Sequence, residues 1–360
     1  MAMRLQQLMA RGISACVVVF ALGTLFPLNA ESIEWLYDVE VSVASRTQAS
    51  ANDALHKAMQ ICLARVTGRV AVAESSVVTR ALQDPAAYVH QYRFASIADR
   101  YGAENDVLVA QFDKELIQSL AKEARLPIWP ADRPTILLWM SLRGRPQSEI
   151  AKAGTQLGEL ALQRARDRGI KLVLPLMDLA DRMLINTSSV DGQFWLDIEQ
   201  ASKRYATDLV VAGSVKKNVF GEARLHMTTW IDGSAIYKVL EVDDESSAIQ
   251  RGVGYIADLL ADRYALSRDV QNVLRMRVFE IRTIKAYARL LKYIDEQEYI
   301  DSADVVSYSD GVLELDVHTP SPPDRIVTLI KPEGKLVPRL PSHEASVSLD
   351  ELIFSWDGEK

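Results

Sequence analysis

The stretch TILLWMSL, residues 135–142, is an almost unbroken apolar run of strand length, and it constrains the fold more than any other part of the sequence. A strand with one solvent-exposed face alternates apolar and polar residues, whereas a strand covered on both faces is apolar throughout. A second run of this kind, TDLVVAGSV, follows at residues 207–215. The middle of the chain is therefore predicted to hold a sheet whose two faces are both buried.

Strand-like and helix-like patterns alternate along the rest of the chain, which predicts an α/β to α+β fold of small mixed-sheet α/β domains in tandem. Pro127, Pro130 and Pro134 interrupt the pattern, so we expect a linker there, with Trp129 packing between domains. The predicted segments are a signal peptide (1–30), an N-terminal α+β domain (31–126), the proline-rich linker (127–134), an α/β domain (135–266), a small C-terminal α+β domain (272–341) and an acidic amphipathic tail (342–360).

The second of these domains has the most regular pattern. Three strands forming a meander are expected at 208–216, 222–231 and 235–242. A helix is expected at 245–264, because its apolar residues recur at helical spacing and acidic residues stand at its start.

The first thirty residues have the parts of a secretory signal peptide. Arg4 and Arg11 precede an uncharged run, and Ala30 supplies the small residue that signal peptidase requires. The strongly apolar part, residues 13–26, is shorter than the roughly 20 residues that a membrane-spanning helix needs. We therefore expect cleavage after Ala30, a periplasmic location and no stable membrane anchor in the mature chain.

Charge and residue usage exclude several classes of function. Removal of the signal peptide leaves 39 basic and 48 acidic side chains, a formal net charge of −9, which argues against nucleic-acid binding and against docking on anionic lipid. Only one cysteine then remains, so no intrachain disulfide is expected. The five histidines are widely separated and form no local metal-binding motif. No cofactor and no metal are therefore expected.

That cysteine, Cys62, follows His56 in the segment ALHKAMQICLARVTGR, and the pair raises the question of a thiol nucleophile with its base. On a helix, six residues turn the chain by about 600° and advance it by about 9 Å, so the two side chains cannot meet. Cys62 instead shares an apolar helical stripe, with Arg65 off the stripe and Gly68 as the C-terminal stop. Cys62 is therefore predicted to belong to the hydrophobic core.

Asp178 and Asp181, in the segment LPLMDLAD, are the best candidates for chemistry. Two carboxylates three residues apart after a strand can act as acid and base or hold a metal, and they can equally cap the next helix. We expect capping and keep as the alternative a periplasmic hydrolase or metal-dependent enzyme that combines them with His226 in three dimensions. Carboxyl groups with raised pKa in a cleft would favour the enzyme, and an exposed apolar patch would favour a binding protein.

The segment LDELIFSW near the end of the chain has apolar residues at helical spacing: Leu349, Leu352, Ile353 and Trp356. An amphipathic helix is therefore predicted in the tail, and its apolar stripe needs a surface to bury against. Two alternatives stay open. The helix packs on the chain's own C-terminal domain, or it is a partner-binding helix that docks in a groove on another protein.

Four segments together resemble the proteobacterial family known as domain of unknown function 2066, DUF2066: LYDVEVSVASRTQASANDALHKAMQICLARVTGR, RPTILLWMSL, LVLPLMDLAD and ASKRYATDLVVAGSV. The resemblance spans about residues 35–265 and implies no catalytic residue. The second domain also resembles the envelope fold of the TolB N-terminal domain, CsgG and LpoB-type lipoproteins, through ASKRYATDLVVAGSV, the strand meander and the final helix RGVGYIADLLADRYA. Relatives with that fold bind other envelope proteins, so the resemblance implies envelope proteins as partners.

These features together predict an exported, non-enzymatic protein that acts as an interaction or assembly module in the periplasm. The expected partners are other envelope proteins, because neither the charge nor the motifs favour nucleic acid or lipid.

Overall fold

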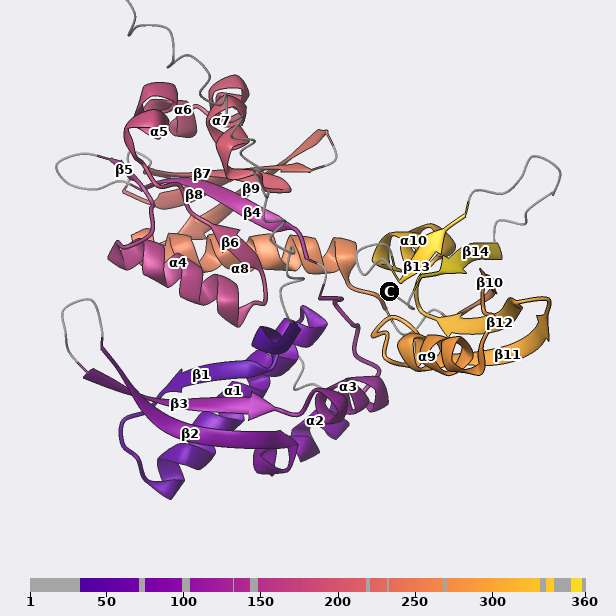
Figure 1. Ribbon diagram of the computed structural model, residues 1–360. Helices are drawn as coiled ribbons and strands as arrows, with labels where there is room; N and C mark the ends of the chain where they lie inside the picture. The colour runs from indigo at the N-terminus through magenta and orange to yellow at the C-terminus, as the bar shows by residue number, and fades with distance from the viewer. Residues whose placement is uncertain are drawn as a thin grey trace, which may run out of the picture. The chain divides into compact units, whose positions relative to one another are not determined.

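The computed structural model describes residues 33–70, 75–98, 104–131, 133–142, 148–217, 221–231, 233–267, 271–330, 335–339 and 351–357. The predicted signal peptide lies outside these residues. Three separate sheets, each with its own helices and core, confirm the expected series of small mixed α/β folds (Figure 1). We call them the N-terminal, central and C-terminal lobes. Within the described ranges, no helix is long and apolar enough to cross a membrane.

The N-terminal lobe is a small α+β unit. Its elements are η1 (Ile33–Leu36), β1 (Asp38–Ser42), α1 (Gln48–Thr67), α2 (Ser76–Ala81), η3 (Pro85–Tyr88), β2 (Val89–Ala98), β3 (Glu104–Phe112) and α3 (Lys114–Glu123). The three strands form an antiparallel sheet in the order β1-β3-β2, so β1 is an edge strand. Helix α1 packs on β1 and β3 and supplies the largest share of the core of this lobe.

Helix α1 begins and ends at residues that favour helix termini. The Thr47 hydroxyl accepts a hydrogen bond from the Ser50 N–H, and Gly68 ends the helix with φ of 72°, a left-handed conformation that glycine adopts without strain. Cys62 is fully buried, as predicted, and His56 is exposed. The apolar stripe read from the sequence is therefore the buried face of this helix.

Arg65 differs from the prediction, because it is buried instead of lying on the wet face of α1. Its guanidinium donates hydrogen bonds to the carbonyl oxygens of Trp35 and Asp38, at 3.0 and 2.6 Å. Those carbonyls belong to η1 and to the first residue of β1, and both elements contact α1. The arginine thus satisfies backbone acceptors that the burial would otherwise leave without a donor.

The central lobe is built on a six-stranded sheet. Its elements are β4 (Thr135–Leu142), β5 (Glu149–Ile150), α4 (Gln156–Asp167), β6 (Lys171–Val173), α5 (Leu179–Leu184), α6 (Thr187–Asp191), α7 (Trp195–Ser202), η4 (Lys203–Tyr205), β7 (Leu209–Lys217), β8 (Ala223–Ile231), β9 (Ser234–Val242) and α8 (Glu245–Tyr264). The main strand order is β5-β4-β7-β8-β9, and β6 also pairs with β4. β4 runs parallel to β6 and β7, and β7, β8 and β9 form the expected antiparallel meander.

Strand β4 confirms the prediction of a strand buried on both faces. Ile136, Leu138 and Met140 belong to the core beneath α4 and α8. Leu137 and Trp139 point to the opposite face and belong to the core beneath α5, α6 and α7. Helices therefore cover both faces of this sheet (Figure 1), which is why the strand is apolar throughout.

The C-terminal lobe follows the order strand, helix, two strands, helix, two strands. Its elements are β10 (Asn272–Phe279), α9 (Ile284–Asp295), β11 (Ser302–Ser309), β12 (Val312–Thr319), α10 (Pro323–Ile330), β13 (Leu336–Pro338) and β14 (Glu351–Trp356). The sheet order is β11-β12-β10-β14-β13, and β14 pairs with β10 in parallel. Without the short edge strand β13, the strand order is that of the split βαβ arrangement, but β14 runs parallel to β10, whereas the last strand of a ferredoxin-like sheet runs antiparallel to the first.

The tail corrects the sequence prediction, because the segment expected to be a helix forms strand β14 between β10 and β13. Leu352, Phe354 and Trp356 are buried in the core of the C-terminal lobe, and Ile353 lies half-buried on the other face. Leu349 lies outside the described residues. A short apolar run fits both periods, and two neighbouring strands supply the hydrogen bonds that favour the strand. The segment therefore folds back into its own lobe as a strand.

Candidate functional site

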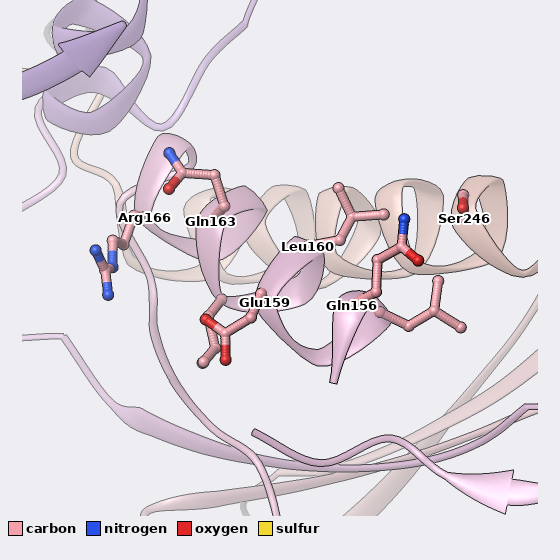
Figure 2. A pocket seen from close by; sticks show the side chains of 8 residues that line it. Gln156, Glu159, Leu160, Gln163, Arg166 and Ser246 are labelled. Carbon is pink, nitrogen blue, oxygen red and sulfur yellow. The ribbon is translucent and has the colours of Figure 1, made fainter. Parts of the chain in front are cut away.

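A surface depression lies along α4 in the central lobe. It has a volume of about 410 Å³ and is lined by side chains of α4 together with Ser246 of α8. Figure 2 shows that these side chains point outward around the helix and do not converge on one point. The one carboxylate among them, Glu159, accepts a hydrogen bond from the Gly154 N–H at 2.8 Å. This carboxylate holds the loop before the helix, and the depression supplies no group suited to catalysis.

Asp178 and Asp181, the pair singled out in the sequence, lie at the start of helix α5. The Asp178 carboxylate accepts a hydrogen bond from the Asp181 N–H at 3.1 Å, so Asp178 is the N-cap of α5. The predicted capping role is therefore confirmed. An N-cap carboxylate satisfies one of the free N–H groups at the start of a helix and is favoured by the helix dipole.

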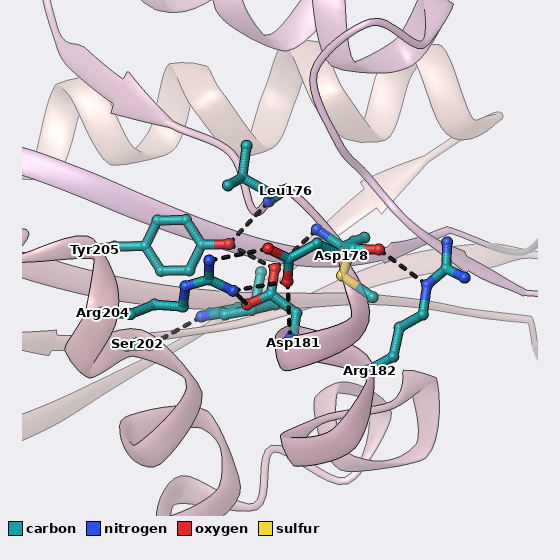
Figure 3. A network of polar contacts seen from close by, with 9 residues as sticks. Leu176, Asp178, Asp181, Arg182, Ser202, Arg204 and Tyr205 are labelled. Atoms are coloured by element: carbon teal, nitrogen blue, oxygen red, sulfur yellow. Dashed lines mark hydrogen bonds and ion pairs between the residues drawn. The ribbon is translucent and has the colours of Figure 1, made fainter.

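Arg204, from the turn η4 after α7, binds both aspartates (Figure 3). Its Nη1 and Nη2 donate to the two carboxylate oxygens of Asp178 at 2.7 and 2.9 Å, and Nη1 also donates to Asp181 at 3.1 Å. The hydrogen bonds from Arg204 lower the pKa of Asp178 to about 2, because they stabilise its charged form. A carboxyl group with this pKa is ionised at neutral pH and has no proton to give as a general acid.

Asp181 is fully buried, and both of its carboxylate oxygens are occupied. Its Oδ2 accepts hydrogen bonds from the Tyr205 hydroxyl at 2.6 Å and from the Met177 N–H at 2.8 Å, while Oδ1 accepts from Arg204. The Tyr205 oxygen accepts in turn from the Leu176 N–H at 2.8 Å. Burial, followed by the hydrogen bond to Asp181, raises the pKa of Tyr205 to about 12, so its hydroxyl keeps its proton and remains a donor. The network closes on itself and clamps α5 to η4 (Figure 3).

His226 takes no part in this network. It lies on β8, where burial lowers its pKa and the positive charges of Lys216 and Arg224 lower it further. Among the residues that the structure describes, no hydrogen bond or ion pair joins His226 to Asp178 or Asp181, so the three candidates are not assembled into one site. No group of three metal-ligating side chains occurs in the described part of the chain.

Large apolar side chains are exposed over helices α5 and α7 and the residues just before them. Their exposed fractions run from 38% to 78%, and they are Leu176, Leu179, Met183, Leu184, Phe194 and Leu196. We call these six residues the α5–α7 surface. The two helices pack against each other, and Figure 1 shows them together on one side of the central sheet. The surface is therefore a feature of one helical layer and not a set of scattered side chains.

The inner sides of these helices are already packed. Trp195 of α7 stacks on Trp230 of β8 with the ring centroids 4.5 Å apart. At the other end of α7, the indole N–H of Trp139 donates to the Ser202 hydroxyl at 2.9 Å. The aspartate clamp fixes α5 in the same way. The exposed apolar residues therefore cannot turn inward without breaking these contacts.

Sequence reasoning missed the α5–α7 surface. One local signal was present, since Leu179 and Met183 are four residues apart and so share one face of a helix. The six-residue length of α5 hid it, because a stripe is hard to recognise over less than two turns. Whether such a face meets a core or solvent depends on the tertiary fold, which residue spacing does not reveal.

Comparison with known proteins gives a family match for one part of the chain. Residues 30–130 match the family described as domain of unknown function DUF8605. This match corrects the resemblance to DUF2066, which is wrong, and it covers less than half of the 360 residues. No protein in the curated comparison matches the chain.

Two solved structures are similar to part of the chain. A competence-damaged protein (CinA) superfamily protein from Enterobacter cloacae is 9% identical, with 36% of this chain and 82% of that chain covered and a TM-score of 0.23. A competence or damage-inducible protein from Enterobacter asburiae is 8% identical, with 36% and 87% covered and a TM-score of 0.24. Likenesses this weak do not establish a shared fold. The sequence resemblance to the TolB, CsgG and LpoB-type proteins is likewise not retained, because the family match is to DUF8605.

Proposed function

We propose that the mature protein is an exported, non-enzymatic interaction module that binds another protein of the cell envelope through the α5–α7 surface. The observation that carries this proposal is the group of six exposed apolar side chains on two adjoining helices whose inner sides are already packed. Contiguous exposed apolar surface is uncommon on soluble monomers and marks sites of association. The acidic net charge of the chain favours a protein partner over an anionic membrane surface.

The polar groups near this surface support binding better than catalysis. A general acid at neutral pH needs a raised pKa, and the pKa of Asp178 is lowered by its hydrogen bonds with Arg204. The Asp181 carboxylate is buried, with each oxygen already accepting a hydrogen bond. These residues hold the helix that carries Leu179 and Met183 in place, which is a supporting role for a binding surface.

Export is supported by the basic start, the short apolar run and the small residue Ala30. Amino-terminal sequencing of the protein recovered from the periplasm is the direct test. We expect the mature chain to begin at Glu31. An intact Met1, or recovery only from the cytoplasm, would contradict the periplasmic proposal.

Site-specific photo-crosslinking tests the binding surface. Benzoylphenylalanine is placed at position 179 or 196, the protein is expressed in its native envelope, and crosslinked partners are identified by mass spectrometry. The matched control is the same group at Ile284, which is 88% exposed on α9 of the C-terminal lobe. We expect one partner to be crosslinked from positions 179 and 196 and not from 284.

The pair Leu179→Ser and Met183→Ser should abolish capture of that partner and leave the thermal midpoint within a few degrees, since exposed side chains contribute little to folding. Its control is the pair Val273→Ser and Ile284→Ser, at exposed positions of another lobe. Equal capture by both double variants would overturn the assignment to the α5–α7 surface.

A further inference from the structure

The N-terminal and C-terminal lobes share the chain path strand, helix, two strands and helix, with α2 and η3 added after α1 in the N-terminal lobe. In the C-terminal lobe the path ends in β14, which pairs in parallel with the first strand, β10. In the N-terminal lobe the chain after α3 leaves the sheet: Ile128 bridges Leu266, and the Trp129 N–H donates to the Val66 carbonyl. Among the described residues, no strand therefore occupies the outer side of β1 (Figure 1).

The backbone of β1 is oriented to accept such a strand. The Phe112 N–H donates to the Tyr37 carbonyl and the Val43 N–H to the Asp106 carbonyl, which fixes the alternation of hydrogen bonds to β3. In an antiparallel pair, every second residue of a strand bonds to the partner strand, and the residues between them point their N–H and C=O groups away from that partner. Those residues are Asp38, Glu40 and Ser42.

One of these outward groups is already used, because the Asp38 carbonyl accepts the 2.6 Å hydrogen bond from Arg65. The peptide groups of Glu40 and Ser42 make no hydrogen bond on this side with any residue that the structure describes. An edge of this kind is a template for a further strand.

A groove of about 910 Å³ includes three residues of this edge strand in its lining, together with residues of β2, β3, α1 and α4. Its walls include Glu40, Val41 and Ser42 of β1, Ile61 of α1 and the last turns of α4. Val41 and Ile61 pack against the core of the N-terminal lobe but are only partly buried. In the C-terminal lobe, alternate side chains of β14, which pairs with the first strand, belong to the buried core. An incoming strand would therefore gain apolar contacts as well as main-chain hydrogen bonds.

The charge of the groove selects the partner. Four cations and two carboxylates line it, and they are Lys57, Arg164, Arg166, Arg168, Glu40 and Asp167. Arg168 is paired with Asp258 at 2.6 Å, and Asp167 accepts a hydrogen bond from Gln163. Arg164 and Arg166 form no ion pair with any residue in the described ranges. Their positive charge suits carboxylates on an incoming chain.

We propose that the open edge of β1 binds an extended, acidic segment of another protein as a fourth strand, parallel to β1. The guest completes the sheet as β14 does in the C-terminal lobe, places its apolar side chains against Val41 and Ile61, and turns its carboxylates to Arg164 and Arg166. This site lies on a different lobe from the α5–α7 surface and does not depend on it.

The test uses two fluorescent peptides of alternating sequence, one of glutamate and valine and one of lysine and valine, titrated with the mature protein by fluorescence anisotropy. We expect the acidic peptide to bind about tenfold more tightly, the effect of two or three partly exposed charge pairs. Arg166→Glu should remove this preference. The matched control Arg289→Glu, on the exposed face of α9, should keep it.

A second variant tests strand pairing. Glu40→Pro removes an N–H that points away from β3, so it should weaken both peptides while the thermal midpoint changes little. Hydrogen exchange should show protection of the Glu40 and Ser42 amides when the acidic peptide is bound.

Three results would overturn the proposal: no saturable binding, equal binding of the two peptides, or binding that Glu40→Pro leaves unchanged. Self-association of the protein that Glu40→Pro abolishes would assign the edge to a second copy and would also overturn it. The pair Leu179→Ser and Met183→Ser should leave peptide binding intact, so this site and the α5–α7 surface succeed or fail separately.

Discussion

Cys62 gives a residue-scale test of the core of the N-terminal lobe. The side chain is fully buried, and burial raises the pKa of the thiol to about 12, so almost no thiolate exists at neutral pH. We expect Cys62 to react with a thiol reagent only as fast as the protein unfolds. Cys62→Ser should lower the free energy of unfolding by about 1–3 kcal/mol, because it buries a hydroxyl without a partner. His56→Ala is the exposed control and should change it by less than about 0.5 kcal/mol.

Asp178 makes stability depend on pH in a definite direction. The pKa of this carboxyl is about 2 in the folded protein, against about 3.9 for an aspartate in an unfolded chain. A lowered folded pKa stabilises the fold above the unfolded pKa, and the contribution is lost as pH falls from about 4 to about 2. Asp178→Asn keeps a capping oxygen but not the charge. The gap in thermal midpoint between wild type and variant should therefore be constant above about pH 5 and shrink toward pH 2.

The same pH series identifies the partner of that charge. Arg204→Gln removes the guanidinium that binds Asp178 at 2.7 and 2.9 Å. In this background the pH-dependent effect of Asp178→Asn should be clearly smaller, since only the hydrogen bonds from the first N–H groups of α5 then lower the pKa of Asp178. A gap of unchanged size in the Arg204→Gln protein would show that the arginine is not the main cause of the lowered pKa.

Single residues were predictable where the decisive partner is close in the sequence. The spacing of α1 placed Cys62 in the core, and the position of Asp178 before a helix predicted the cap. Arg204 is 26 residues from Asp178, and neither residue type indicates the other. The burial of Arg65 was likewise hidden, because its acceptors are backbone carbonyls of a segment 27 to 30 residues away.

At the scale of elements, long and strongly periodic segments were predicted well. Helix α8 runs over Glu245–Tyr264 as expected, and the three strands of the central meander appear in the expected places. The tail failed because the six residues of β14 fit both a helical and a strand period. Its strand form depends on β10, which lies more than 70 residues earlier. Short segments with distant partners are where periodicity gives the least information.

Phe354 tests whether β14 is part of the folded core. Phe354 is fully buried, and its neighbour Ile353 is half-buried on the other face of the strand. Phe354→Ala should cost about 3–5 kcal/mol in unfolding free energy, the usual cost of emptying a buried aromatic site. Ile353→Ala is the matched control on the same strand and should cost clearly less. Urea unfolding measures both, and an equal small effect would mean that the strand does not complete this core.

At the scale of the whole molecule, the sequence predicted a series of small α/β folds and a linker at 127–134, and the positions of the domain boundaries stay predictions. Trp129 is buried, and the segment around it is tied by the bridge between Ile128 and Leu266. Composition did not reveal that, among the described residues, no strand pairs with the outer edge of β1 in the way that β14 pairs with β10. A missing strand leaves no mark in local periodicity, because it is a property of how elements pair.

Arg133, in the same linker, makes the connection testable. Its side chain is buried and donates to four backbone carbonyls, which belong to Arg65, Trp129, Pro130 and Gly169, and its guanidinium lies 4.1 Å from the Trp129 ring centroid. Removing the side chain leaves several buried carbonyl acceptors without donors, and each costs about 1 kcal/mol or more of unfolding free energy. Part of this cost is offset, because the protein no longer buries a charged group. Arg133→Met should therefore lower the unfolding free energy by about 2–4 kcal/mol.

Arg133→Lys separates charge from hydrogen bonding. Lysine keeps the positive charge but has three donors on one nitrogen, which cannot match the fork of a guanidinium. We expect urea unfolding to rank the proteins wild type, Arg133→Lys, Arg133→Met in decreasing stability. If the methionine variant equals or exceeds the wild type, the buried charge is a net cost, and the carbonyls at 65 and 169 do not need this arginine to stay in place.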